Sequence, residues 1–161
     1  AQDISLTLFT GEVVPYLEPL ISGHECQLSP PMQRRLEVLE PSLREYQSAW
    51  SDCEHLRHEL ARFFSRFDLL LCPTTVVPAH PHSVTELEVD TNRVPPRNAV
   101  RATVPFDLTG SPAISVPFGW SAEGLPIGVQ LVSRHFEEKT LLQAASALER
   151  AFLGEKRRPP V

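Results

Sequence analysis

The stretch at residues 109–133, TGSPAISVPFGWSAEGLPIGVQLVS, limits the possible folds of this chain more than any other part of its sequence. It contains two short apolar runs, at 112–118 and 127–132, and the segment between them is rich in glycine and proline. Short apolar runs bounded by these residues are typical of β-strands, and a brief glycine-containing connection is typical of a turn between two strands. We therefore predict two strands joined by a turn.

A long amphipathic helix is predicted upstream of these strands. Between residues 42 and 67, apolar side chains recur every three or four positions, which indicates one buried face on a helix of about 25 residues. Ser42 is followed three residues later by Glu45, the spacing of a capping box that binds free amide groups at a helix start. A shorter helix, at about 31–40, is expected to end before Pro41. The apolar stripe consists of Leu43, Tyr46, Ala49, Trp50, Cys53, Leu56, Leu60, Phe63, Phe64 and Phe67.

The long helix leads directly into a third predicted strand. Residues 69–72 are apolar without alternation, a pattern that favours a strand buried on both faces. A last helix is predicted from Glu137, with an apolar stripe that ends at Phe152. The order of these elements predicts an α/β fold in which the chain forms the terminal part of a mixed β-sheet covered by helices.

Two segments carry weaker patterns. Residues 1–30 contain Pro15 and Pro19 and read as an irregular connection. Residues 76–99 are proline-rich and read as a long surface loop, and loops of this length inside compact domains are often functional. With 161 residues in total, residues 1–161 are predicted to be a single segment of one domain.

Composition excludes several classes of function. The net charge is −5, whereas nucleic acids and anionic membrane surfaces require a concentrated basic surface, so neither is expected as a partner. No apolar run is long enough for a membrane span and no signal-peptide pattern is visible, which predicts a cytoplasmic protein. The three cysteines, Cys26, Cys53 and Cys72, are widely spaced and odd in number, which favours reduced thiols.

For each candidate catalytic residue, the sequence favours a structural role over a catalytic one. Ser121 lies in a near match to the Gly-x-Ser-x-Gly elbow of serine hydrolases, but a second strand follows it where that mechanism needs a helix, so a turn residue is favoured. Cys72 with His80 or His82 could form a thiol and base, but only the residue types support the pair, and a buried thiol with exposed histidines is favoured.

The remaining candidates concern metals and lysine chemistry. His55 and His58 lie three apart on the long helix, but no further ligand follows at a recognised spacing, so no metal site and no cofactor are predicted. The two lysines are Lys139 and Lys156, and none of the thirteen serines are adjacent. Chemistry that needs a serine pair and a buried lysine therefore cannot be built from this chain alone, and no catalytic residue is predicted in it.

The strand pair carries a family resemblance. The segments LTGSPAISVP at 108–117 and GLPIGVQLV at 124–132, together with FFSRFDLLLCPTT upstream, are similar to the carboxy-terminal part of amidase signature enzymes. The resemblance covers about residues 31–153. It implies a hydrolase that cleaves carboxamides with a Ser-Ser-Lys triad, and the stretches that carry this triad have no counterpart in the sequence.

The same resemblance implies a role for residues 100–107. In family members, the aligned segment lines the substrate site, which marks Val100, Val104 and Asp107 as candidate pocket residues. Position 107 is usually asparagine in the family, so Asp107 is a departure. Val100 stands where glutamine-using amidotransferases place an acid, which predicts a small-molecule amide substrate less polar than glutamine.

Three interpretations of the whole chain follow from the resemblance. The first is the carboxy-terminal portion of an amidase, inactive alone, that dimerises through exposed strand edges or associates with the missing amino-terminal part. The second is a non-catalytic binding or scaffold protein that retains this half of the fold. The third is a separate subunit that completes its active site with a partner chain.

Overall fold

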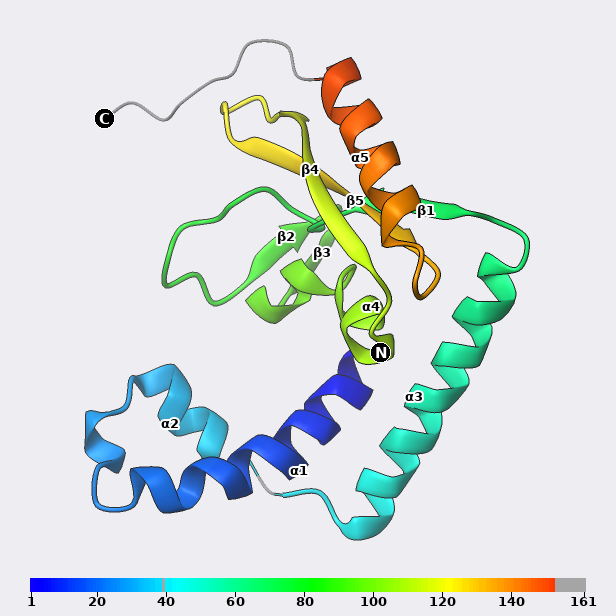
Figure 1. Ribbon diagram of the computed structural model, residues 1–161. Coiled ribbons are helices and arrows are strands. Elements are labelled where there is room, and N and C mark those ends of the chain that lie inside the picture. Colours follow the sequence, from blue (N-terminus) through cyan, green and yellow to red (C-terminus); the bar gives the residue numbers. More distant parts are fainter. Residues whose placement is uncertain (39, 153–161) are drawn as a thin grey trace. The chain divides into compact units, whose positions relative to one another are not determined.

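The computed structural model describes residues 1–38 and 40–152 and consists of helices and antiparallel strands, which confirms the predicted α/β class (Figure 1). The chain divides into two compact units, Ala1–Leu56 and the part from Arg57 onward. Among the described residues, every helix is too short or too polar to cross a membrane.

The first unit begins with a helix where the sequence predicted an irregular connection. Helix α1 (Gln2–Ile21) contains both Pro15 and Pro19, so the prediction for residues 1–30 was wrong over most of its length. A proline inside a helix costs about 3 kcal/mol because it removes a backbone hydrogen bond, and packing must offset that cost. The short elements η1 (Glu25–Gln27) and α2 (Pro30–Leu36) follow.

Helix α1 packs against a tyrosine that is distant in the sequence. The Tyr46 hydroxyl donates a hydrogen bond to Oε1 of Glu12 at 2.7 Å. Glycine at position 11 leaves room for the Tyr46 ring, because a Cβ there would lie only 2.8 Å from the ring carbon Cδ2. Leu8 and Val14 are also buried on this helix. Local periodicity could not reveal these contacts, which lie more than 30 positions apart in the sequence.

Helix α3 (Leu43–Phe64) begins with the predicted capping box. The Glu45 carboxylate accepts hydrogen bonds from the Ser42 amide at 2.8 Å and from its hydroxyl at 2.7 Å, and the Glu45 amide donates to Ser42 Oγ at 3.3 Å. The two bonds from Ser42, first from its side chain and then from its backbone, lower the pKa of Glu45 below its ordinary value. The helix is shorter than predicted, because 42–67 was expected and the helix ends at Phe64.

The capping box predicts a dependence of stability on pH. Since the pKa of Glu45 is lower in the folded chain than in the unfolded one, its contribution is complete above the unfolded pKa and is lost as pH falls through the folded pKa. We expect Glu45→Gln to lower the urea midpoint of helix unfolding at pH 7 and the difference from wild type to disappear towards pH 3. Circular dichroism at 222 nm measures it, with the exposed Glu149→Gln as control. A difference unchanged between pH 7 and pH 3 would contradict this assignment.

The second unit is built on a three-stranded antiparallel sheet. Its strands are β1 (Leu69–Pro73), β4 (Ala113–Trp120) and β5 (Pro126–Ser133), and their order is β1-β5-β4. The β4–β5 pair confirms the predicted strands and turn. Strand β5 is central, whereas β4 is at one edge of the described sheet. An edge position suits Pro117, because proline has no amide proton to donate.

Side chains on both faces of the sheet are buried. On one face, Val116 and Leu131 pack with Leu141 and Ala145 of helix α5 (Glu138–Phe152), which lies along the β4–β5 pair in Figure 1. On the other face, Val132 packs with Phe64 and Phe106. The doubly buried strand is therefore β5. Strand β1, predicted to be buried on both faces, is only partly covered, and Leu71 is 53% exposed.

The proline-rich segment 76–99 is more structured than predicted. It contains the hairpin of β2 (Leu87–Val89) and β3 (Asn92–Val94), whose turn places Asp90 at φ 56°. The short helix η2 (Pro96–Val100) follows, and α4 (Val104–Thr109) leads into β4. Strands of three residues carry too little alternation to be recognised from the sequence.

Candidate functional site

The three predicted pocket residues lie on successive helical turns between the β2–β3 hairpin and β4. Val100 ends η2, and Val104 and Asp107 belong to α4. The Thr103 amide donates to the Val100 carbonyl at 3.0 Å and the Asp107 amide donates to the Thr103 carbonyl at 3.2 Å, so the helical backbone continues across the junction. Positions three and four apart share a helix face. The backbone thus brings the three residues to one side of this segment.

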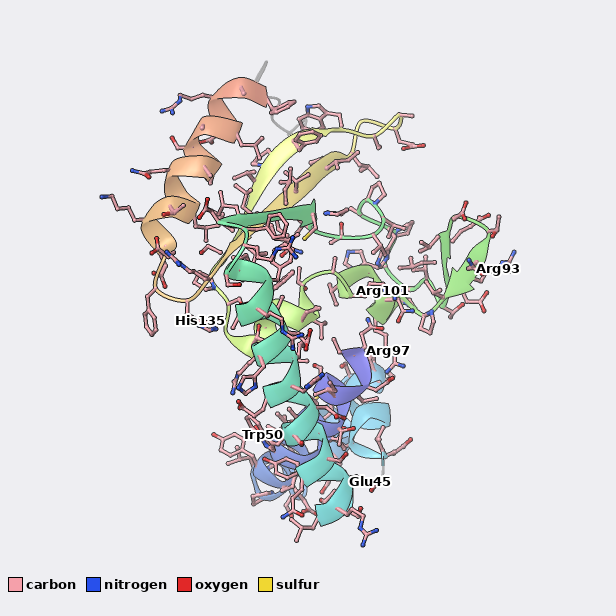
Figure 2. The ribbon with its side chains drawn as sticks, turned by 90° about the vertical axis from the view of Figure 1, so that its right-hand side faces the viewer. Glu45, Trp50, Arg93, Arg97, Arg101 and His135 are labelled. Atoms are coloured by element: carbon pink, nitrogen blue, oxygen red, sulfur yellow. The ribbon has the colours of Figure 1, made fainter. Side chains whose placement is uncertain are left out.

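That side is open to solvent, whereas the opposite side belongs to the core. Val100 is 47% exposed, Asp107 is exposed and Val104 is half-buried. Phe106 faces the other way and is buried with Phe64 and Val132. Figure 2 labels Arg97 and Arg101 on the same segment, one within η2 and one directly after it. This surface therefore combines two valines with a carboxylate and flanking arginines.

A glycine cap ends α4 and directs the chain into β4. Gly110 has φ 65°, a left-handed conformation that glycine adopts without strain. The Ser111 amide donates to the Phe106 carbonyl at 3.0 Å, as in a Schellman motif. Its backbone conformation is what requires glycine, because the nearest atom to a Cβ at this position would be 3.8 Å away.

Gln130 anchors the candidate pocket to the sheet, and sequence reasoning did not identify it. Its side chain is buried in the middle of β5, and Nε2 donates to the Pro73 carbonyl at 3.1 Å and to the Ala102 carbonyl at 2.8 Å. Ala102 lies between Val100 and Val104, so the Gln130 side-chain amide links the segment at 100–107 to the end of β1. A lone polar residue in an apolar strand was the available signal, since buried polar groups are normally hydrogen-bonded.

A second anchor crosses β5 at Gly128. The hydroxyls of Thr74 and Ser115 lie 2.8 Å apart, and a Cβ on Gly128 would be 3.0 Å from Ser115 Oγ and 3.2 Å from Thr74 Oγ1. Gly128 therefore gives room for two side-chain hydroxyls, because a Cβ would be crowded by both. Strands β1 and β4 are therefore linked across the central strand.

Ser121 is a turn residue, as predicted. Its Oγ accepts hydrogen bonds from the amides of Glu123 and Leu125, both at 3.2 Å, and its own amide donates to the Leu125 carbonyl at 2.8 Å. The chain then enters β5. The hydroxyl oxygen therefore stabilises the turn between the two strands, and a strand follows it where an elbow would need a helix.

Cys72 has the properties of a structural thiol. Burial raises its pKa, and a hydrogen bond with Gln130 only partly opposes that effect. A thiol with a raised pKa is a weak nucleophile near neutral pH, because the thiolate is the reactive form. His80 and His82 are exposed on the segment that follows β1.

The three cysteines should differ in reactivity. With N-ethylmaleimide at pH 7, we expect modification of exposed Cys26 first, slower modification of Cys72 because of its raised pKa, and protection of Cys53, which is 1% exposed. Peptide mass spectrometry over time measures the three rates, and the Cys72 rate should increase between pH 7 and pH 9. Modification of Cys72 as fast as that of Cys26 would show an activated thiol instead.

The structure does not bring the histidine pair or Lys139 into a metal or catalytic site within the described part of the chain. Within residues 1–38 and 40–152, no group of three or more His, Cys, Asp or Glu side chains is placed to hold a metal ion, and His55 and His58 are no exception. Lys139 is exposed in the first turn of α5, and Lys156 lies outside the described residues.

Comparison with known proteins identifies the family. The sequence profile of the amidase family matches residues 22–142, which is most of the chain. The chain belongs to the amidase family. Its relatives include the fatty acid amide hydrolase of Medicago truncatula, which is 36% identical over 118 residues, 73% of this chain and 19% of that protein. A glutamyl-tRNA(Gln) amidotransferase subunit of Parvibaculum lavamentivorans is 43% identical over 96 residues, 60% of this chain and 19% of that protein.

Solved amidase structures share the fold. A crystal structure described as an amidase superposes with a TM-score of 0.87 at 29% identity and covers 94% of this chain. The chain accounts for 35% of that structure and about a fifth of each curated relative. This amidase chain therefore corresponds to a fragment of the family's fold, and the segments that support the resemblance, β4, β5 and the turn between them, lie inside the matched range.

Proposed function

We propose that this chain is the carboxy-terminal portion of an amidase signature hydrolase and that it forms one wall of the substrate pocket. The complete enzyme would hydrolyse a carboxamide through a Ser-Ser-Lys triad located outside this chain. The observation that carries the proposal is the exposed face with Val100, Val104 and Asp107, which Gln130 holds against the sheet of an amidase fold. This face offers binding groups, and its valines suit an apolar part of a substrate.

The proposed reaction assigns the bond changes to groups outside the chain. A neutral lysine takes the proton of the nucleophilic serine through the second serine, the serine oxygen attacks the amide carbonyl, and the C–N bond breaks as the amine leaves with a proton. Water then hydrolyses the acyl-enzyme to the acid. Orientation of the amide by the pocket wall contributes through proximity, which holds the carbonyl at the attacking oxygen.

An amidase assay with separated parts tests the proposal. We expect no hydrolysis of aliphatic or aryl amides by this chain alone and recovered hydrolysis after it is mixed with the matching amino-terminal segment. The amino-terminal segment alone is the control, and a mixture with chain unfolded in urea controls for impurities. Turnover by the isolated chain would overturn the placement of the triad, and no turnover by a folded, associated mixture would overturn the proposed activity.

The substrate preference is testable at Val100. If this residue selects against polar substrates, Val100→Asp in the assembled enzyme should raise KM for an aliphatic amide with little change in kcat. Val100→Ile, which keeps the apolar character, should preserve both constants. Faster release of ammonia from free glutamine than from aliphatic or aryl amides by the wild-type enzyme would contradict the predicted preference.

The two outer strands of the sheet could pair with strands of another chain. Strands β1 and β4 are at the two edges of the described sheet, and unpaired strand edges are templates for pairing with further chain. We propose that these edges join the remaining sheet of the amidase or, without it, a second copy of this chain. Light scattering should show a dimer of the isolated chain that gives way to a one-to-one complex with the amino-terminal segment. A monomer at all concentrations that does not bind this segment would contradict it.

The same assays distinguish the two other interpretations of the chain. A non-catalytic binding protein would bind amides without recovered turnover, and a separate subunit would require a partner encoded as its own chain. The predicted cytoplasmic location stays a prediction.

A further inference from the structure

A cavity separate from the Val100 face has a lining that points to an anion. This open cavity has a volume of about 310 Å³, near the lower end of the roughly 300–1,000 Å³ typical of small-molecule sites. Three segments of the second unit form it: the last turns of α3, the junction of α4 with β4, and the loop between β5 and α5. Its basic lining residues are Arg57, Arg134 and His135, and no carboxylate is among the described residues that line it.

Each of the two arginines makes a hydrogen bond within the protein. Nη2 of Arg57 donates to the Leu108 carbonyl at 3.3 Å, and this side chain is half-buried. Nη2 of Arg134 donates to Oε1 of Glu137 at 3.0 Å. A guanidinium carries five N–H groups in a planar fork, so a guanidinium that protein contacts orient can also bind a ligand oxygen.

Hydroxyl groups add adaptable partners on one side of the cavity. Thr109 Oγ1 donates to the Pro105 carbonyl at 2.9 Å and lies 2.9 Å from Ser111 Oγ. The Thr109 hydroxyl donates its proton to the Pro105 carbonyl, so Ser111 is the donor between the two hydroxyls. The Ser111 hydroxyl can rotate to donate to a ligand in the cavity instead, at the cost of its hydrogen bond to Thr109. The His135 ring lies beside Gly110, with Cε1 3.8 Å from the place of a Cβ on that glycine.

The opposite wall is apolar. Leu60, Ala61 and Phe64 of α3 line it, and Phe64 is almost fully buried. The α3 carbonyls near this wall carry the negative end of the helix dipole, which disfavours a bare anion close to them. A ligand that places an apolar body on this wall and its charge towards the arginines avoids that repulsion.

We infer that this cavity binds a small monocarboxylate with an aryl or short aliphatic body. The carboxylate is held by the two guanidinium groups, with the Ser111 hydroxyl as a third donor, and the body packs on α3. This inference does not depend on the proposed amidase function, because none of the residues that carry it belongs to the Val100 face.

The first test compares benzoate with three related probes. The isotope-labelled chain is titrated with sodium benzoate, benzamide, sodium acetate and sodium phosphate at constant ionic strength, and amide shifts are followed by NMR. We expect saturating shifts at Arg57, Ser111 and His135 with benzoate, and affinity about tenfold weaker for benzamide, since a charge-assisted hydrogen bond is lost. Acetate should bind more weakly than benzoate because it lacks the apolar body. Benzamide equal to benzoate, or phosphate tighter than benzoate, would overturn the inference.

The second test uses two matched arginine variants. Arg134 and Arg93 are both exposed and both pair with a glutamate, but Arg93 belongs to the β2–β3 hairpin, away from the cavity lining (Figure 2 labels Arg93 and His135). We expect Arg134→Gln to weaken benzoate binding about tenfold and Arg93→Gln to leave it unchanged. Ser111→Ala should weaken it less. Equal affinities for the two arginine variants, with folding confirmed by circular dichroism, would contradict the assignment.

Discussion

Replacing Gln130 by leucine should lower the free energy of unfolding of the sheet-containing unit by about 2 kcal/mol, because two partly buried carbonyls lose their hydrogen-bond donor. These are the carbonyls of Pro73 and Ala102, which Nε2 of Gln130 reaches at 3.1 and 2.8 Å. Leucine is similar in volume to glutamine, so packing on β5 is largely kept and the lost bonds dominate. The effect should extend to function, since the Ala102 bond positions the segment that carries Val100 and Val104.

Urea unfolding followed by tryptophan fluorescence measures this effect. A Trp50→Phe background leaves Trp120, on β4, as the reporter for the sheet. Gln143→Leu is the matched control, because Gln143 is exposed on α5 and the same substitution there should change stability little. In the assembled enzyme, Gln130→Leu should also raise KM. A loss below about 1 kcal/mol for Gln130→Leu would show that water or a shifted backbone replaces the amide.

The second large effect is expected at Gly128. A Cβ there would lie 3.0 Å from Ser115 Oγ and 3.2 Å from Thr74 Oγ1, and these two hydroxyls are themselves hydrogen-bonded at 2.8 Å. Alanine should cost about 1 kcal/mol and valine about 3 kcal/mol, because a larger side chain must separate the hydroxyl pair and shift its strands. The same fluorescence measurement applies.

Two comparisons separate crowding from a general effect of changing glycine. Gly119 lies on β4 with open space around the place of a Cβ, so Gly119→Ala should be close to neutral. In the double variant Ser115→Ala with Gly128→Ala, the closest contact is removed, and the cost should be smaller than the sum of the two single changes. Strict additivity of the two changes would mean that the hydroxyl pair is not the source of the cost.

Much of the second unit was predictable because its patterns are local. The β4–β5 pair and the start of α5 follow from spacing over a few residues, as does the capping box of Ser42 and Glu45 in the first unit. Burial was predicted less well. Phe152, which ends the predicted apolar stripe of the last helix, is 50% exposed, and Leu142 on the same helix is 57% exposed.

The candidate site could be predicted only in part. The resemblance pointed to Val100, Val104 and Asp107, and the helical backbone brings them to one side, while their role in a pocket stays a prediction. Gln130 was missed because a polar residue in a buried strand indicates that its side chain is hydrogen-bonded but does not indicate which residue accepts the bond. Its partners, at 57 and 28 positions away, come from other elements of the fold.

The sequence by itself determined the family, the β4–β5 strand pair and the helices α3 and α5, because each depends on residues near one another along the chain. Tertiary structure alone decided the rest. Helix α1 contains Pro15 and Pro19 and packs against Tyr46 at Gly11. Strand β5, not β1, is the doubly buried strand because its neighbours and α5 enclose it. Local periodicity shows which apolar side chains share one face of a helix or strand. It does not show which group hydrogen-bonds to a buried polar atom or packs against a glycine, because those groups come from distant segments of the chain.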